Sequence, residues 1–195
     1  MALTAGATGN VIGDTTAAAR NIISGSANQG VFISDSGTTN NVIEGNYIGL
    51  TRLGTTPLPN TYCGVGIYHG AQGDLIGGVS ASARNIISGN SQQGVVISDT
   101  GTNLNLVRGN YIGTLPSGTT VMANGNGGVA VFSGAQSNTI GGSLAGSGNL
   151  VSGNTGDGIF VGCSGTNSNV VLGNRIGLNQ AGTAMVGNGG AGVSL

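Results

Sequence analysis

The sequence predicts an all-β fold, a right-handed parallel β-helix in which short parallel strands wind into a solenoid of about six coils. Three observations predict it: an offset of 64 residues aligns the chain with itself without gaps, Gly and Asn recur at fixed places in that repeat, and short Val- and Ile-rich segments separate them. We expect a single domain over residues 1–195, made of three double-coil repeats at about 4–67, 68–131 and 132–195.

Each repeat divides into two coils, because the segment 10–12 resembles the segment 41–43 of the same repeat. Every coil offers three apolar segments that are too short and too interrupted by Gly and Asn to be ordinary helices. The first strands are predicted to centre on Ile12, Ile43, Ile76, Val107, Ile140 and Val171. The third strands are predicted to begin at Val31, Val65, Val95, Val129, Ile159 and Val193.

Side-chain alternation assigns the two faces of the third strand. Val31 and Ile33 are expected to point into the tube. Phe32 is expected to point outward, and so are Gly66 and Val96, which occupy the same position in the next two coils. Because successive coils lie about 4.8 Å apart, like residues stack in columns. We therefore expect amide ladders from the columns Asn21, Asn85, Asn149 and Asn46, Asn110, Asn174.

Two sets of longer connections leave the coils. The longest, at 50–63, 114–127 and 178–191, repeats its Gly, Thr and Asn positions and is predicted to be a structural loop. The second set, at 14–20, 78–84 and 142–148, varies more, and its Ala-rich form is compatible with one helical turn.

Composition excludes two classes of partner. Charged residues make up 6 % of the chain and the net charge is −1, with five Arg far apart in sequence and without aromatic neighbours, so we expect no nucleic-acid partner. No apolar run approaches the roughly 20 residues of a membrane span, so no membrane span is expected. Residues 1–10 have neither the basic nor the apolar region of a signal peptide.

The repeating units carry a family resemblance. The segments Asn41–Ile48 and Asn85–Asn90, closed by Gly94–Ser98, resemble the right-handed parallel β-helix repeat proteins of the pectate-lyase-like superfamily. That resemblance implies an extracellular or cell-surface location. It leaves activity open, because the superfamily includes polysaccharide lyases, hydrolases and epimerases together with many surface proteins that lack known chemistry.

One column of polar residues is the candidate catalytic site. Immediately after the third strand, successive coils place Asp35, His69 and Asp99, so the single His is predicted to lie between two carboxylates within hydrogen-bonding reach. The alternative is that these are surface turn residues, since Asp at such corners commonly caps its own turn. No second His supports a metal site, and no cofactor is expected. The remaining acidic side chains, among them Asp14, Glu44 and Asp74, are expected to be solvated corner residues.

Two further surfaces suggest binding. Tyr47 and Tyr111 share one column, and Tyr68 and Phe132 share another, so these four residues are candidates for a shallow carbohydrate-binding strip. A minor alternative is an ice-binding face made of threonine columns. These threonines follow Gly at turns, which favours turn chemistry; they are Thr38, Thr102, Thr166, Thr55, Thr119 and Thr183.

Cysteine usage and the chain ends add two expectations. Cys63 and Cys163 are predicted to lie three coils, about 14 Å, apart and to remain free thiols, which weighs against an exported protein. The chain is expected to begin just after a third strand and to end on one, which predicts either head-to-tail stacking with copies of itself or excision from a longer solenoid.

The leading functional interpretation is a non-catalytic solenoid scaffold or surface module that binds carbohydrate or assembles with itself, because similar columns run along all faces without a charged cluster. The rival interpretation is a carbohydrate-active enzyme of the lyase, hydrolase or epimerase type that uses Asp35, His69 and Asp99.

Overall fold

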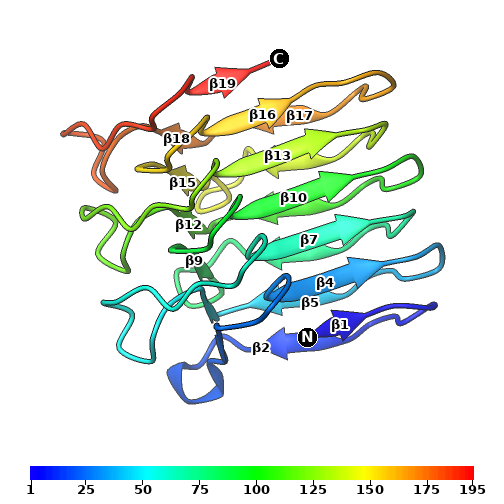
Figure 1. Ribbon diagram of the computed structural model, residues 1–195, viewed down its shortest axis with the longest axis horizontal. Coiled ribbons are helices and arrows are strands. Elements are labelled where there is room, and N and C mark those ends of the chain that lie inside the picture. Colours follow the sequence, from blue (N-terminus) through cyan, green and yellow to red (C-terminus); the bar gives the residue numbers. More distant parts are fainter.

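Short parallel strands form three sheets that run along the axis of the molecule (Figure 1). The structure is a computed structural model and describes residues 1–195. Each strand pairs in parallel with the equivalent strand of the next coil, so the molecule is a parallel β-solenoid. The N-terminus and the C-terminus lie at opposite ends of the stack.

The seven-stranded sheet consists of β1 (Ala2–Leu3), β4 (Val31–Ser34), β7 (Val65–Tyr68), β10 (Val95–Ser98), β13 (Val129–Phe132), β16 (Ile159–Val161) and β19 (Val193–Ser194). The first six-stranded sheet consists of β2 (Val11–Gly13), β5 (Val42–Glu44), β8 (Leu75–Gly77), β11 (Leu106–Arg108), β14 (Thr139–Gly141) and β17 (Val170–Leu172). The second consists of β3 (Ile22–Ile23), β6 (Tyr47–Ile48), β9 (Ile86–Ile87), β12 (Tyr111–Ile112), β15 (Leu150–Val151) and β18 (Arg175–Ile176).

The predicted strand positions are confirmed, with one correction at the start of the chain. The residues expected at the centre of each first strand pair in one column, and the predicted third strands begin where the sequence places them. Residues Ala2–Leu3 form β1, which pairs with Phe32 and Ile33, so the chain begins within a third strand and not just after it. The segment 14–20 contains one 3₁₀ turn, η1 (Ala17–Ala19), while 78–84 and 142–148 contain none. No helix is long and apolar enough to cross a membrane.

The tube is filled by one continuous apolar core. The inward positions of the third strand, such as Val31 and Ile33, are fully buried, as the alternation predicts. Val96 differs from expectation, because it points outward yet is buried like the core residues. Its sheet neighbour is Gly66, over which the ring of Tyr68 is folded, and this ring covers the outer face beside Val96.

Asparagine ladders fix the corners. The two predicted columns form a single ladder, because their members alternate from one coil to the next and each is hydrogen-bonded to the following one. In order, the ladder consists of Asn21, Asn46, Asn85, Asn110, Asn149 and Asn174. In a typical rung, the side-chain nitrogen Nδ2 of Asn85 donates to Asn110 Oδ1 at 3.0 Å and to the carbonyl oxygen of Ile43 at 2.7 Å. Every polar atom of the buried amide is thereby paired with the neighbouring coils.

Two further ladders escaped prediction. One consists of Asn60, Asn90, Asn124, Asn154 and Asn188, and the other of Asn10, Asn41, Asp74, Asn105, Asn138 and Asn169. Asp74 was expected to be a solvated corner residue, and that expectation is wrong. Its side chain occupies an Asn position inside the second of these ladders and is completely buried.

Candidate functional site

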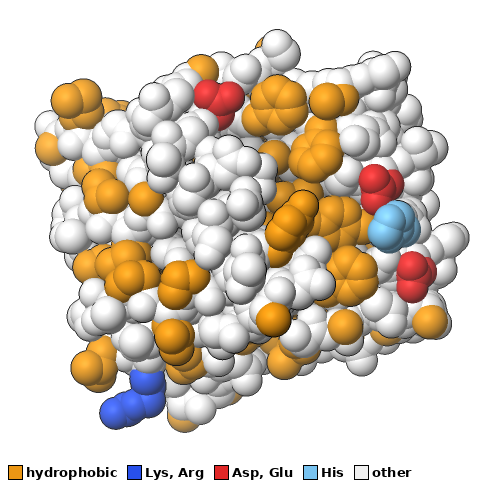
Figure 2. Space-filling model, viewed as in Figure 1, with side chains coloured by type: hydrophobic (Ala, Val, Ile, Leu, Met, Phe, Trp, Pro, Cys, Tyr) orange, Lys and Arg blue, Asp and Glu red, His pale blue; other side chains and the backbone are white.

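The outer surface of the seven-stranded sheet carries four aromatic side chains, Phe32, Tyr68, Phe132 and Phe160, which we call the aromatic face. They come from β4, β7, β13 and β16, and all four are partly exposed. Figure 2 shows hydrophobic side chains gathered over these strands, with the single histidine at the edge of the patch between two acidic side chains. Phe32 and Phe160 were not among the binding residues predicted from the sequence, although both occupy the outward position of a third strand.

Two glycines allow the rings to lie across the sheet. A Cβ atom at Gly66 would lie 2.3 Å from a ring carbon of Tyr68, and one at Gly162 would lie 2.6 Å from a ring carbon of Phe160. The Phe32 and Tyr68 rings are 5.6 Å apart between centroids and tilted by 34°. Any side chain at either glycine would lift the ring above it, so glycine at both positions sets how flat the aromatic face is.

A hollow of about 460 Å³ lies beside Phe132 and Phe160. Polar groups of Gln93, Asn126 and Asp157 line it next to the two rings. The Asp157 carboxylate is oriented by the backbone N–H of residue 191, which donates to it at 2.7 Å. The surface thus combines apolar ring faces with hydrogen-bonding groups, which is the usual composition of a small-molecule or sugar site.

The phenol of Tyr68 is anchored beneath the face. Its hydroxyl lies 3.6 Å from Cys63 Sγ. Burial raises the pKa of Tyr68 well above its usual range, with a further contribution from Cys63. Burial likewise raises the pKa of the Cys63 thiol to about 11. Both groups therefore stay neutral near pH 7 and act as hydrogen-bonding groups and not as charges.

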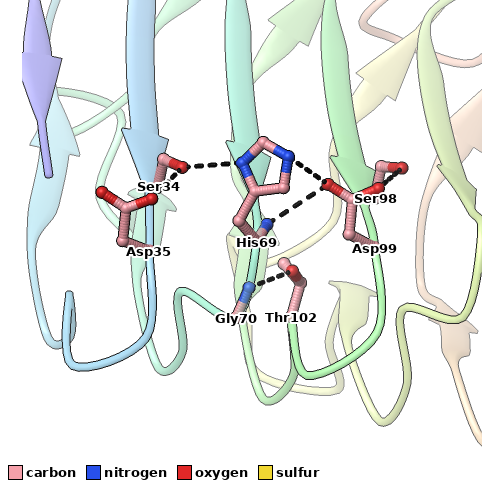
Figure 3. Close-up of polar contacts among 7 residues, drawn as sticks. All are labelled: Ser34, Asp35, His69, Gly70, Ser98, Asp99 and Thr102. Atoms are coloured by element: carbon pink, nitrogen blue, oxygen red, sulfur yellow. Dashed lines mark hydrogen bonds and ion pairs between the residues drawn. The ribbon is translucent and has the colours of Figure 1, made fainter. Parts of the chain in front are cut away.

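The predicted column of Asp35, His69 and Asp99 lies at the carboxyl ends of β4, β7 and β10 in the seven-stranded sheet (Figure 3). His69 Nε2 is 3.2 Å from Asp99 Oδ2, and His69 Nδ1 is 3.0 Å from Ser34 Oγ. The Ser34 hydroxyl donates to Asp35 Oδ1 at 2.9 Å. The structure therefore brings His69 and Asp99 into direct contact, whereas Asp35 reaches the ring only through Ser34. Ser34 was missed from the sequence, where it appears as one polar residue at the end of a strand.

The residues of this column form turns that are hydrogen-bonded between coils. Asp35, His69 and Asp99 all adopt left-handed backbone conformations, with φ of 81°, 51° and 82°. Asp35 accepts a hydrogen bond from the backbone N–H of Ala5, and Asp99 accepts one from the backbone N–H of His69, so both carboxylates bind the turn of the preceding coil.

Access to the groups of this column also limits their chemistry. Ser34 is 1 % exposed and is not accessible as a nucleophile, while the His69 side chain is 63 % exposed to solvent. None of the three predicted residues lines the hollow beside Phe132. No three His, Cys, Asp or Glu side chains converge as a metal-ligand set.

Tyr47 and Tyr111 belong to a different surface from Tyr68 and Phe132. They lie in β6 and β12 of the second six-stranded sheet, so the four predicted residues do not form one strip. The guanidinium of Arg20 stacks on Tyr47 at 4.2 Å from the ring centroid, and that of Arg84 stacks on Tyr111 at 4.0 Å. Tyr111 is only 5 % exposed. The expectation that the arginines lack aromatic neighbours is therefore wrong for Arg20 and Arg84. Each stacks on a tyrosine that is 27 residues away in sequence, so the contact is not apparent from the local sequence.

The threonine columns divide between two environments. Thr38 and Thr102 are buried, and their hydroxyl oxygens accept hydrogen bonds from the backbone N–H groups of Gly6 and Gly70. Thr166 does the same in the next repeat. The second set, Thr55, Thr119 and Thr183, lies exposed in the long connections. The first set therefore holds turns together inside the solenoid.

Comparisons of the chain with protein-family models, with curated proteins and with solved structures returned no match. Its class is defined by its own architecture: a parallel β-solenoid with three sheets and three side-chain ladders.

Proposed function

We propose that the chain is a non-catalytic β-solenoid module that binds a polysaccharide through the aromatic face. The observation that carries this proposal is the set of four aromatic side chains on the outside of one sheet, next to a hollow lined by amide and carboxylate groups. Sugar rings present C–H faces that stack on aromatic rings, and their hydroxyls hydrogen-bond to amides and carboxylates.

The arrangement of the rings along the axis favours an extended polymer. Tyr68 and Phe132 occupy the same outward position two strands apart, because Ile97 of the strand between them pairs with both Ile67 and Val131, the residues that precede them. At a coil spacing of roughly 4.8 Å, this places them about 10 Å apart, close to the length of one disaccharide in an extended β-linked chain. Phe32 and Phe160 flank them toward the two ends of the sheet. A chain running parallel to the solenoid axis would meet rings at both of its ends and in its middle.

The non-catalytic part of the proposal is supported by the chemistry of the Asp35–Asp99 column. Its serine is buried, its histidine is largely in solvent, and its carboxylates bind backbone turns. Membership of the pectate-lyase-like superfamily and a location outside the cell or on its surface are part of the same proposal. The coil architecture and the asparagine ladders support the first of these, and binding to a polysaccharide would make sense of the second.

Polysaccharide binding is tested on a glycan array followed by titration of the best ligand. We expect neutral β-linked polymers to bind, and we expect Tyr68→Ala and Phe132→Ala each to weaken binding about tenfold or more, in line with the loss of one stacking partner. Leu53→Ala is the matched control, since Leu53 is 72 % exposed in the 50–63 connection, and it should change affinity by less than about twofold. Absence of any bound glycan, or equal losses in all three variants, would overturn the proposal.

A further inference from the structure

The third repeat lacks a stacked pair that the first two repeats contain. Arg20 stacks on Tyr47 in the first repeat, and Arg84 stacks on Tyr111 in the second. The 64-residue offset places Gly148 at the Arg position and Arg175 at the Tyr position of the third repeat. The third repeat therefore lacks both the arginine that stacks and the tyrosine ring on which it stacks in the first two repeats.

A hollow of about 820 Å³ lies where the missing pair would stack. Its walls include Arg84 and Tyr111 on one side and Arg175 on the other. Leu150 lines it as well and lies between them in the sheet, because it pairs with Tyr111 on one edge and with Arg175 on the other. A Cβ atom at position 148 would lie 2.0 Å from the carbonyl oxygen of residue 173, so no side chain can enter the hollow from there without backbone movement.

The charges around this hollow are of one sign. Two guanidinium groups line it and no carboxylate does. The Arg84 Nε–H donates to the carbonyl oxygen of Gly109 at 3.1 Å, and one face of the guanidinium lies on Tyr111, so this group is held in place. Its two terminal nitrogens have no acceptor within the protein. Arg175 Nη1 donates to the carbonyl oxygen of Gln180 at 2.6 Å, which leaves its other terminal nitrogen free.

We infer that this hollow, which we call the Arg84–Arg175 hollow, is a binding site for a small anion that carries a carboxylate, phosphate or sulfate on an apolar body. Guanidinium groups recognise planar or tetrahedral oxyanions through paired N–H donors. Leu144, 64 % exposed at the rim, and the buried Leu150 supply apolar contact for the rest of the ligand. A volume of about 820 Å³ is within the range of small-molecule sites. The site lies on a different sheet from the aromatic face and does not depend on polysaccharide binding.

The test is a titration, by NMR or calorimetry, with phenyl phosphate, phenyl sulfate and benzoate, with phenol as the uncharged control. We expect at least one of the three anions to bind about tenfold or more tightly than phenol and to weaken as salt is added, because the recognised group is charged. The order of the three affinities identifies which oxyanion the site prefers. Phenol binding as tightly as every anion, or no saturable binding by any of them, would overturn the inference.

Three variants locate the site. Arg84→Met removes the charge and keeps the length of the side chain, and Arg175→Tyr restores the residue found in the first two repeats. Both should weaken anion binding about tenfold or more. Arg20→Met removes the equivalent stacked arginine where none of the hollow residues lies, and it should change affinity by less than about twofold. Thermal unfolding of each variant checks that it is folded. A loss in Arg20→Met equal to that in Arg84→Met would show that the anion binds to arginines without a built site, and would overturn the inference.

Discussion

Asp74 Oδ1 accepts two hydrogen bonds from Asn41, one from its backbone nitrogen and one from its side-chain nitrogen, both at 2.9 Å. The other oxygen, Oδ2, is buried and has no partner. At the equivalent position of the next double coil, the amide nitrogen of Asn138 donates to Asn169 and to the carbonyl oxygen of Thr102. Asp74 thus presents an acceptor where the ladder requires a donor, and burial raises the pKa of its carboxyl group, partly offset by the hydrogen bonds from Asn41.

Replacing Asp74 with Asn should stabilise the protein. By analogy with Asn138, the new amide is expected to donate to the next Asn of the ladder and to a backbone carbonyl oxygen, and relieving one buried unsatisfied group is worth about 1–3 kcal/mol. The measurement is thermal unfolding followed by circular dichroism at pH 7. Asn105→Asp is the matched control, because it places the same defect in the next rung and should lower the midpoint. An unchanged or lower midpoint in Asp74→Asn would contradict the ladder geometry.

The same substitution should remove a pH dependence. Because the folded-state pKa of Asp74 is raised, its contribution to stability is fully present below the unfolded pKa of about 4 and is lost as pH rises through the folded pKa. The stability difference between Asp74→Asn and the native chain should therefore be smallest near pH 3 and grow toward neutral pH. A difference that stays constant across that range would contradict the raised pKa, because it would mean that Asp74 has the same pKa in the folded and unfolded states.

The inward and outward faces of the third strand predict unequal costs for one substitution. Ile97→Asp places an unpaired carboxylate in the fully buried core and should cost several kcal/mol. Phe32→Asp lies on the partly exposed outer face and should cost much less. Urea unfolding of both variants compares them directly. Equal losses would mean that the assignment of the two faces is wrong.

The two free cysteines should differ sharply in reactivity. Cys163 is exposed, whereas Cys63 is buried with its pKa raised to about 11, so very little Cys63 thiolate exists at pH 8. With a disulfide-exchange reagent at pH 8, we expect one thiol per chain to react quickly and the second only after denaturant is added. Cys163→Ser should abolish the fast reaction. If the fast phase survives in that variant, the burial of Cys63 is incorrect.

Loss of the His69 side chain should have small effects. The contact between His69 and Asp99 is exposed, and such pairs contribute about 0–1 kcal/mol. We expect His69→Ala to keep polysaccharide binding and to show the same absence of lyase and hydrolase turnover as the native chain. Detectable turnover on a polysaccharide that disappears in His69→Ala would establish the rival enzymatic interpretation.

Sequence reasoning predicts the solenoid well because its signals are local and repeated. Short Val and Ile segments recur within each 64-residue repeat as well as between repeats, and this determines which strands pair. The pairing of Val11 with Val42 and of Leu75 with Leu106 follows from the division of each repeat into two coils. The burial of Asp74 follows from the same repeat, since residues 10, 41, 105, 138 and 169 are all Asn. The burial of Asp74 is therefore indicated by its column and not by its residue type.

The candidate sites are less predictable, because they depend on side chains from different coils. The Arg84–Tyr111 stack joins residues 27 positions apart, and nothing in either segment alone indicates it. Folding of the Tyr68 ring over Gly66 depends on a rotamer that the sequence does not specify. Ser34 enters the contact with His69 only because neighbouring coils place a strand end beside a turn. The spacing predicts the column of Asp35, His69 and Asp99, but it does not predict how exposed these side chains are.

The alternation of two coil types gives the outer surface a translational period of two coils, roughly 10 Å. A feature carried by one coil type recurs at that interval, as Tyr68 and Phe132 do on the seven-stranded sheet. A polymer with a matching period would contact Tyr68 and Phe132 together, and the second contact would form at the high effective concentration set by the first. Binding strength should then increase with ligand length in steps of one period, so that short oligomers bind weakly and long ones bind by avidity.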